Sequence, residues 1–216
     1  ICSTCERREA SNKPVNKYWE EQTTERLELL HTDIAGPADE CFEGSRFAIF
    51  FLDDYRRMRK VYALRHKSEA LWTLKQFERD VAKATGLQIK HLRSDRGAEF
   101  TGETFRKFYA ENGIKQEFSA AYTPQRNGVA ERSWRSVFEM TQSKVITVNM
   151  GHRHWAGAAR AAVYCLNRAP TRPHNGGAPY EKWQGTTSKL DHLRVFGCTA
   201  YVMFQSQQRF KFEDKA

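Results

Sequence analysis

The first half of the chain changes from short apolar runs to a longer run with helical spacing. Residues 68–85 carry apolar residues such as Leu74 and Phe77 every three or four positions, which predicts a helix. Ser68 is its expected N-cap, and Gly86 is its expected end. The shorter runs are rich in apolar residues and predict strands, which cover residues 27–34, 46–53 and 59–65.

The second half of the chain adds two more strands and several helices. The predicted elements are a strand at 87–93, a helix at about 103–112, a strand at 114–118, a loop at 119–127 and helices at 128–149 and 152–167. Three strands, a helix, a strand, a helix and a strand followed by helices indicate an α/β protein. This order alone fits several α/β folds.

Both ends of the chain differ in composition from the middle. Residues 1–25 are polar and have no sustained period, so we expect the end of one module and a linker before a core at 26–170. Residues 173–179 are rich in Pro, Gly and Asn and are typical of a linker. Alternation from Leu193 to Phe204 then predicts a hairpin. Residues 171–216 would therefore be a linker and the start of a small β-rich module.

Three acidic residues each occupy a distinctive position along this pattern. Asp33 closes the first predicted strand, Asp95 follows the fourth, and Glu131 opens a helix after a Pro/Gly loop. Three carboxylates from three elements can converge on one point. Such a cluster suits phosphodiester chemistry, in which two divalent cations hold the attacking and leaving oxygens. Oxygen ligands favour Mg²⁺.

The residues around these acids resemble the copia-type branch of retroelement integrases. The three segments that carry this resemblance are 31–37 (His-Thr-Asp-Ile-Ala-Gly-Pro), 93–100 and 122–132. Further matches lie at 52–55, 66–69, 166–171 and 192–198, so the resemblance covers nearly the whole chain. One departure lies between Asp95 and Glu99, where Arg96 and Ala98 replace the Asn and Gly that are usual in this family. The acids themselves are unchanged. This difference therefore bears first on how the substrate is handled, and only then on metal binding.

The resemblance implies a fold, an activity and a set of partners. The fold would be ribonuclease-H-like, an α/β fold with a mixed five-stranded sheet flanked by helices, here with a C-terminal β-rich extension. Asp33, Asp95 and Glu131 would be catalytic and would hold two Mg²⁺ or Mn²⁺ ions. The reaction would be 3′-end processing and strand transfer of element cDNA into double-stranded target DNA by a homo-oligomer. Integration would take place in the nucleus, after a stage in a cytoplasmic virus-like particle.

Other acids lie near the same predicted strand ends. Glu99 is a possible accessory acid because it shares a motif with Asp95. Asp53 and Asp54 end the second predicted strand, but an Asp-Asp-Tyr sequence of the copia type favours a structural or turn-forming role. We therefore expect the metal site to exclude Asp53 and Asp54.

Polar and basic residues beside Glu131 are candidates for DNA binding. In the predicted loop these are Gln125, Arg126 and Asn127, and on the following helix they are Arg132 and Arg135. Arg side chains can grip phosphates through paired hydrogen bonds. Glu131 and Arg135 are one turn apart and share a face. The opposite face should be buried through Ala130, Trp134, Val137, Phe138 and Val145.

The overall charge agrees with a nucleic-acid partner. The net charge is +9 and the isoelectric point is about 9.4. Residues 55–67 hold six Lys/Arg and no acid, and residues 126–176 hold eight Lys/Arg and two acids. Charge alone would equally fit a solvated basic face, but the second group surrounds Glu131. No run of 18 apolar residues occurs, which argues against a membrane span.

The five cysteines do not suggest a disulfide framework. Cys41, Cys165 and Cys198 are expected to be packed thiols. Cys2 and Cys5 have the spacing of half a zinc knuckle, and the resemblance implies a His-His-Cys-Cys module before the catalytic core. We expect Zn²⁺ only in the complete upstream module, because the two His ligands would precede this segment.

Two other functions remain open at this level. The same fold could serve a ribonuclease-H-type nuclease, although such an enzyme would not need the Pro/Gly loop before Glu131. The chain could also be a decayed or domesticated element that has been retained as a DNA-binding module. The three intact acids argue against decay.

Overall fold

The apolar runs form a mixed sheet of five strands. The computed structural model describes residues 23–118, 124–149, 151–171 and 174–200. The sheet order is β3-β2-β1-β4-β5, with β1–β2 and β2–β3 antiparallel and β1–β4 and β4–β5 parallel. The strands are β1 (Leu29–Ala35), β2 (Phe47–Asp53), β3 (Arg59–Leu64), β4 (His91–Ser94) and β5 (Lys115–Phe118). The predicted five-stranded sheet is confirmed.

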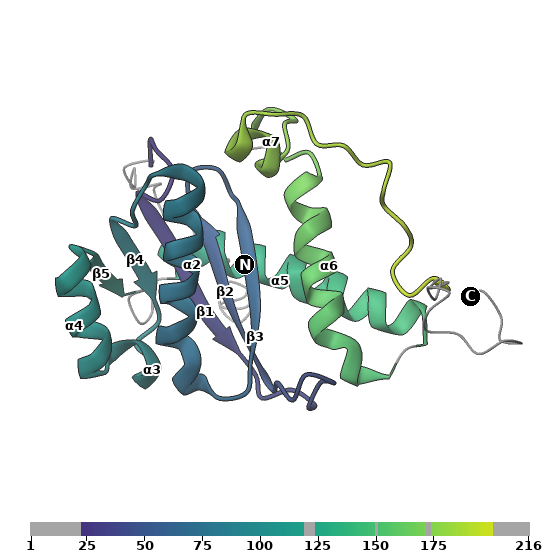
Figure 1. Ribbon diagram of the computed structural model, residues 1–216, viewed down its shortest axis with the longest axis horizontal. Coiled ribbons are helices and arrows are strands. Elements are labelled where there is room, and N and C mark those ends of the chain that lie inside the picture. Colours follow the sequence, from purple (N-terminus) through teal and green to yellow (C-terminus); the bar gives the residue numbers. More distant parts are fainter. Residues whose placement is uncertain (1–22, 119–123, 150, 172–173, 201–216) are drawn as a thin grey trace, which may run out of the picture.

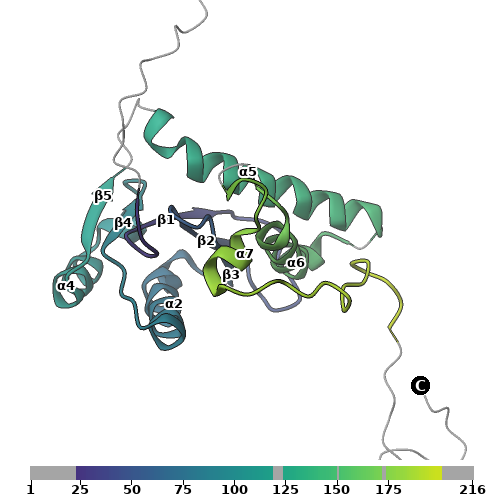
Figure 2. The same ribbon diagram turned by 90° about the horizontal axis from the view of Figure 1, so that it is seen from above.

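Helices cover both faces of this sheet (Figures 1 and 2). Seen from above in Figure 2, α2 and α4 lie on one side, whereas α5 and α6 lie on the other. The helices are η1 (Lys67–Glu69), α2 (Ala70–Thr85), α3 (Ala98–Thr101), α4 (Glu103–Asn112), α5 (Pro124–Thr147), η2 (His152–His154), α6 (Trp155–Arg168) and α7 (Pro179–Gln184). None of the helices in the described residues is long and apolar enough to cross a membrane.

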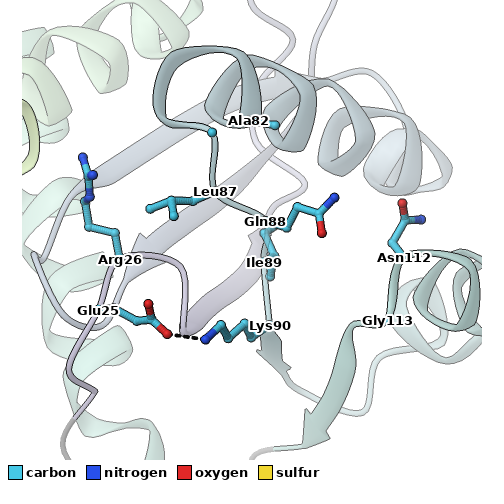
Figure 3. Close-up of a pocket in the computed structure, with 10 residues that line it drawn as sticks. Glu25, Arg26, Ala82, Leu87, Gln88, Ile89, Lys90, Asn112 and Gly113 are labelled. Carbon is cyan, nitrogen blue, oxygen red and sulfur yellow. Dashed lines mark hydrogen bonds and ion pairs between the residues drawn. The ribbon is translucent and has the colours of Figure 1, made fainter.

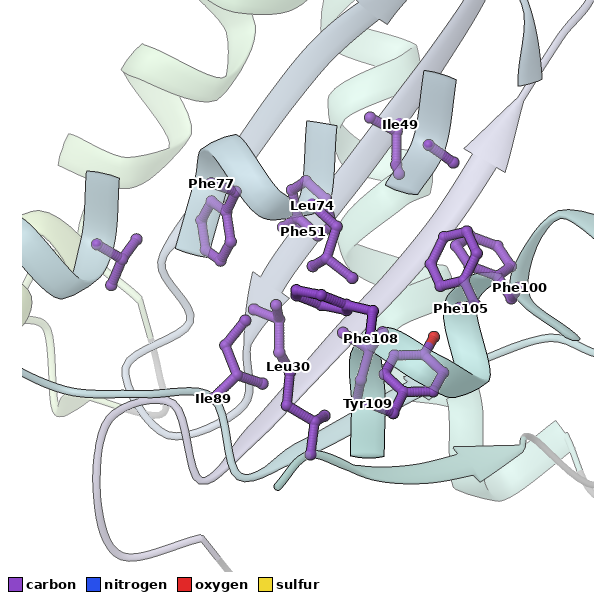
Figure 4. Packing of buried hydrophobic residues seen from close by; sticks show 14 of the residues in the cluster. Leu30, Ile49, Phe51, Leu74, Phe77, Ile89, Phe100, Phe105, Phe108 and Tyr109 are labelled. Atoms are coloured by element: carbon purple, nitrogen blue, oxygen red, sulfur yellow. The ribbon is translucent and has the colours of Figure 1, made fainter. Parts of the chain in front are cut away.

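Strand β2 contributes side chains to two separate cores. Ile49 and Phe51 point toward α2 and α4, where Phe51 stacks on Phe77 with ring centroids 4.6 Å apart (Figure 4). The alternate residues Phe50 and Leu52 point to the opposite side and pack with α5 and α6. A central strand that is buried on both faces explains why the run from 47 to 52 is continuously apolar.

The predicted helix limits are partly correct. Gly86 ends α2 in the left-handed conformation, with φ of 70°, and donates its N–H to the carbonyl of Ala82, as expected. The predicted cap at Ser68 is wrong, because Ser68 lies inside η1 and the residue before α2 is Glu69, whose side chain makes no capping hydrogen bond. The residues that precede α2 already form one tighter turn, so no separate cap is present at Ser68.

The helix that carries Glu131 differs from its prediction in two respects. It begins at Pro124, so the predicted loop is wrong for residues 124–127. Proline fits the first turn of a helix because the amide hydrogen that it lacks would have no partner there. The inward face contains Ala130, Val137 and Val145, as predicted, but Phe138 is 51% exposed and lies outside it.

The C-terminal segment packs differently from the prediction. Helix α7 follows the expected linker, and its Trp183 is only 7% exposed within the core on the α2 side. The predicted hairpin is wrong for residues 193–200, which contain no strand, and residues 201–204 lie outside the described part of the chain. His192 Nε2 and the hydroxyl of Tyr164 instead lie 2.5 Å apart, which links this segment to α6.

Candidate active site

Neighbouring parallel strands bring Asp33 and Asp95 to the same edge of the sheet. β1 and β4 pair with His31 opposite Arg93, so continuing this register by two residues sets Asp33 level with Asp95. Asp33 is half-buried near the end of β1, whereas Asp95 is exposed just beyond β4. In open α/β sheets, ligands bind outside the carboxyl ends of the strands. The two acids therefore occupy a position suited to a ligand.

Burial and the charges of neighbouring acids change the pKa of Asp33. Burial is the largest cause that raises the pKa of Asp33, and the N–H of Ile34, which donates to Asp33 Oδ1 at 2.8 Å, opposes it. The negative charges of Asp95, Glu131 and Glu99 add to the effect of burial, and the pKa rises to about 6. Carboxylates raise one another's pKa only when they are close in space. The charges of Asp95, Glu131 and Glu99 therefore act on Asp33.

The donor set at this point fits a hard divalent cation. Mutual repulsion among carboxylates is relieved when a cation binds between them, and oxygen donors suit Mg²⁺. Within the described residues, no three Asp, Glu, His or Cys side chains are arranged as a ready metal site. Mg²⁺ commonly binds through one or two carboxylates and completes its shell with water and substrate phosphate. An open set of acids is compatible with that mode.

Gly97 lets the carboxylates of Asp95 and Glu99 approach each other. Its N–H donates to Asp95 Oδ1 at 3.0 Å. A Cβ atom added to Gly97 would lie 2.8 Å from Glu99 Oε2 and 3.0 Å from Asp95 Oδ1. Real Cβ atoms essentially never come as close as 2.8 Å to another heavy atom, so any larger residue would displace Glu99. The glycine retained in this motif therefore has a steric reason.

Lys67 is a basic residue of this site that the sequence reasoning did not assign. Its Nζ lies 2.9 Å from Glu99 Oε1. The hydrogen bond and charge of Glu99 raise the pKa of Lys67, with further contributions from Asp95 and Asp33. Residues 66–69 belong to a segment that resembles the integrase family, and this was the only signal of its role in the sequence. Lys67 therefore places one positive charge near Glu99, Asp95 and Asp33.

Asp53 and Asp54 are structural, as predicted. Asp53 is 2% exposed and accepts the backbone N–H groups of Leu27 at 2.7 Å and Arg56 at 2.6 Å. Asp54 pairs with Arg57, with 2.6 Å between Nη1 and Oδ1. In the register of the sheet, Asp53 lies opposite Leu30 at the beginning of β1, away from Asp33. These contacts shape the turn between β2 and β3.

Other candidate residues are placed only in part. Arg132 and Arg135 are exposed on α5, close in sequence to Glu131. Gln125, Arg126 and Asn127 belong to the first turns of α5, and their side chains lie outside the described structure, as do Cys2 and Cys5. Of the three thiols predicted to be packed, Cys41 is buried and Cys165 is half-buried. The prediction is wrong for Cys198, which is exposed because its segment forms turns instead of a packed hairpin.

A cavity of about 400 Å³ lies at the other end of the parallel strands (Figure 3). It is lined by the segment Leu87 to Lys90, which enters β4, and by Gly113, which precedes β5. An ion pair between Lys90 and Glu25 borders it. Asp95 follows β4 at the opposite end, so this cavity does not contain the acidic cluster. We place the candidate active site at the acids because charge and strand register converge there.

Comparison with known sequences identifies related proteins. Residues 23–124 match the family described as integrase core domain. The retrovirus-related Pol polyprotein from transposon TNT 1-94 of Nicotiana tabacum is 34% identical over 191 residues, which cover 88% of this chain and 14% of that polyprotein. The chain therefore spans about a seventh of the length of this relative.

Comparison with solved structures supports the fold. The catalytic core domain of BIV integrase is 19% identical, with a TM-score of 0.55 over 74% of this chain and 95% of that chain. A chain of the simian T-cell lymphotropic virus intasome in complex with PP2A regulatory subunit B56 gamma is 13% identical, with a TM-score of 0.59 over 83% of this chain and 60% of that chain. These similarities confirm the predicted ribonuclease-H-like fold.

Proposed function

We propose that this chain, which contains an integrase core domain and is homologous to retrotransposon Pol polyproteins, processes the 3′ ends of element DNA and joins them to target DNA. Membership of this family implies polynucleotidyl transfer. The more specific reaction, which comprises both end processing and strand transfer, is our inference. Asp33, Asp95 and Glu131 are the residues that we assign to it.

One observation supports this proposal more than any other. Asp33 has a pKa of about 6 because it is buried and because Asp95, Glu131 and Glu99 surround it with like charge. Lys67 pairs with Glu99 and compensates one of these charges, but a cluster of acids is still costly to a folded protein, and perturbed titration of this kind concentrates at functional sites. Structural acids of the same protein, such as Asp54, have their partners within the chain. The partner of the Asp33 cluster is therefore expected to come from outside the protein.

We assign the cluster to two divalent cations, Mg²⁺ or Mn²⁺. Asp33, Asp95 and Glu131 would hold them, and Glu99 would be an accessory acid. When bound, such ions activate an attacking oxygen and stabilise the charge on the leaving oxygen. The carboxylates themselves hold and orient the ions, and Asp33 must lose its proton before it can contribute a full negative charge. No covalent protein nucleophile is required in this mechanism.

The exposed basic residues beside the acids would bind the DNA backbone. Arg132 and Arg135 lie on the same helix as Glu131 and can form paired hydrogen bonds with phosphate oxygens. We extend the proposal to Gln125, Arg126 and Asn127 in the first turns of α5. The partners would be double-stranded element ends and target DNA, and joining two ends would require more than one copy of the chain. We propose the nucleus as the site of this reaction.

A strand-transfer assay tests the proposal directly. The chain, extended by its upstream module, would be incubated with Mg²⁺, a labelled DNA end of the element and a target duplex. We expect products in which the labelled 3′ end is joined to the target. Asp95→Asn should abolish these products and leave circular dichroism unchanged, because the substitution removes a negative oxygen and preserves side-chain volume.

The same assay separates this proposal from nuclease activity. A ribonuclease-H-type enzyme would cut the RNA strand of a hybrid and give no joined DNA. A DNA-binding module without catalysis would shift the DNA in a gel and give neither product. Either of these results from a folded wild-type protein would contradict the proposed function.

A further inference from the structure

Arg59 links the sheet to the helix that carries Glu131. Its Nε donates a hydrogen bond to Ser133 Oγ at 2.6 Å, and Ser133 lies two residues after Glu131 on α5. Resting on the function proposed above, we propose that Arg59 and Ser133 form a positioning contact that sets the axial position and rotation of α5, and thereby the place of Glu131 beside Asp33. Neither residue needs to touch the DNA or the cations.

Ser133 differs from the other hydroxyl residues of α5. Ser136, Thr141 and Ser143 donate their hydroxyls to the carbonyl four residues earlier in the same helix. Ser133 is 7% exposed, and its hydroxyl oxygen accepts a hydrogen bond from another element, β3. Among the α5 side chains that the structure describes, those of residues 129–147, no other one makes a hydrogen bond to a strand of the sheet. The contact therefore has a function that hydrogen bonds within the helix do not provide.

The chemistry of Arg59 makes this contact strong and specific. Burial, followed by the charge of Arg57, lowers the pKa of Arg59 to about 10, so its side chain still carries a full charge at neutral pH. Hydrogen bonds from a charged donor are roughly twice as strong as neutral ones. A second nitrogen, Nη1, donates to the carbonyl of Arg57 at 3.2 Å and limits rotation of the guanidinium. Within the described residues, no carboxylate pairs with Arg59, so Ser133 is its partner on α5.

The backbone of Arg59 is fixed independently of its side chain. Asn167 on α6 is 3% exposed; its Oδ1 accepts the N–H of Arg59 at 2.9 Å, and its Nδ2 donates to the carbonyl of Arg59 at 2.8 Å. These two bonds hold β3 against α6. Since they use only main-chain atoms of Arg59, they can persist when its side chain is replaced. A substitution at Arg59 therefore tests the contact to α5 separately.

The apolar contacts of α5 cannot by themselves define where Glu131 stands. Ala130 and Val137 pack against the sheet, and the ring of Trp134 lies 4.7 Å from that of Phe50. The apolar stripe selects which face of α5 is turned inward, but hydrophobic attraction is non-directional and fixes the axial position of the helix less sharply than a hydrogen bond does. A slip of one turn moves a residue by about 5.4 Å. A single directional bond next to Glu131 prevents such a slip.

Two variants and a matched control test this inference. Ser133→Ala removes the acceptor, and Ser136→Ala removes a hydroxyl from the exposed side of the same helix, where it bonds only within α5. We expect the turnover of strand transfer to fall about tenfold in Ser133→Ala and the dissociation constant for DNA to stay within about twofold. Arg59→Lys should have the same effect, and the double variant should be no worse than Arg59→Lys alone.

A measurement without metal or DNA reports the helix position directly. The chain has five tryptophans, and 5-fluorotryptophan gives each one a fluorine signal. We expect the signal of Trp134, assigned with a Trp134→Phe variant, to shift in Ser133→Ala. The signals of Trp72, which is exposed on α2, and of Trp183, which packs in the core on the α2 side, should not move. Ser136→Ala should leave all of these signals unchanged.

Several outcomes would overturn the inference. Unchanged turnover in Ser133→Ala would remove the contact from the function of the site, and an unchanged Trp134 signal would show that α5 had not moved. Equal changes at every buried tryptophan would indicate general loosening, and weaker DNA binding at constant turnover would make Arg59 a phosphate ligand. If wild-type protein lacks strand transfer, the proposed function fails, whereas the fluorine measurement still decides whether Arg59 positions the helix.

Discussion

Asp54 and Asp33 are half-buried carboxylates of the same sheet, but they are held in opposite ways. Burial tends to raise the pKa of Asp54, yet the hydrogen bond to His31, the charge of Arg57 and a hydrogen bond from Thr23 outweigh it and hold the pKa well below its usual range. Among the described residues, Asp33 accepts a hydrogen bond only from the neighbouring backbone N–H of Ile34, and its pKa rises to about 6. In this part of the chain, Asp54 has the side chains of His31 and Arg57 as partners, whereas Asp33 has no side-chain partner.

This difference separates acids that stabilise the fold from acids reserved for a ligand. An acid surrounded by donors contributes to folding in its charged form, because folding supplies its counter-charges. An acid surrounded by other acids opposes folding in its charged form until an external cation arrives. The tests below alter one side of this comparison at a time.

The largest effect is expected at Glu131. We predict that Glu131→Gln reduces strand transfer by about a thousandfold, since it removes a negative oxygen that would stabilise charge in the transition state. Glu139→Gln is the matched control, because Glu139 is the other acid of α5 and is also exposed. Its activity should equal that of the wild type. Comparable losses of strand-transfer activity in both variants would show that an amide at either position of α5 is harmful. Glu131 would then have no special role.

Asp54→Asn should destabilise the fold by about 2 to 3 kcal/mol at pH 7, because it leaves Arg57 and His31 without their carboxylate. Urea unfolding measures this change. The folded-state pKa of Asp54 is lowered, so its contribution is present above the unfolded value near 4 and is lost as the pH falls below it. Equal stability of the variant and the wild type at pH 7 would show that Asp54 does not stabilise the fold.

Asp33→Asn should act in the opposite direction and stabilise the metal-free protein by about 2 kcal/mol at pH 7, less than the full pKa shift implies because the side chain is partly exposed. Here the folded-state pKa is raised, so wild-type stability falls as the pH rises from about 4 to about 6 and is level above that. The difference between the variant and the wild type should vanish near pH 4. Destabilisation at pH 7 would show that Asp33 has internal partners after all.

The smallest effect concerns the arginines beside the acids. In Arg132→Ala and Arg135→Ala, the slope of log affinity for DNA against log salt should become shallower by about one unit per lost phosphate contact. Arg79 is an exposed arginine of α2, on the other side of the sheet, and Arg79→Ala provides the control. A change in slope for Arg79→Ala and none for the α5 variants would show that DNA binds on the α2 side of the sheet instead.

Several features could be predicted because they depend on short stretches of sequence. The central strand β2 follows from an apolar run, and the end of α2 follows from a glycine that can adopt a positive φ. The structural role of Asp53, the last residue of β2, is predicted from the resemblance of its Asp-Asp-Tyr sequence to the copia type. These are local effects in which the backbone responds to the nearest residues.

Other features could not be predicted because they depend on contacts between distant segments. Pro124 is compatible with a loop or with the first turn of a helix, and the sequence does not choose between them. Phe138 has the spacing of the buried stripe on α5, but the inward-facing residues are those that meet β2 and α6. The burial of Trp183 of the short helix α7 depends on a core built by distant segments.

The sequence by itself determined the five strands, the positions of three acids at element ends and the family to which the core domain belongs. Only the tertiary structure decided that Glu99 and Lys67 join these acids. It also decided that the pKa of Asp33 is raised while that of Asp54 is lowered, and that Arg59 contacts Ser133, 74 residues away in the sequence. The reason is that periodicity and turn chemistry act between neighbours in the chain, whereas burial and charge interaction depend on distance in space.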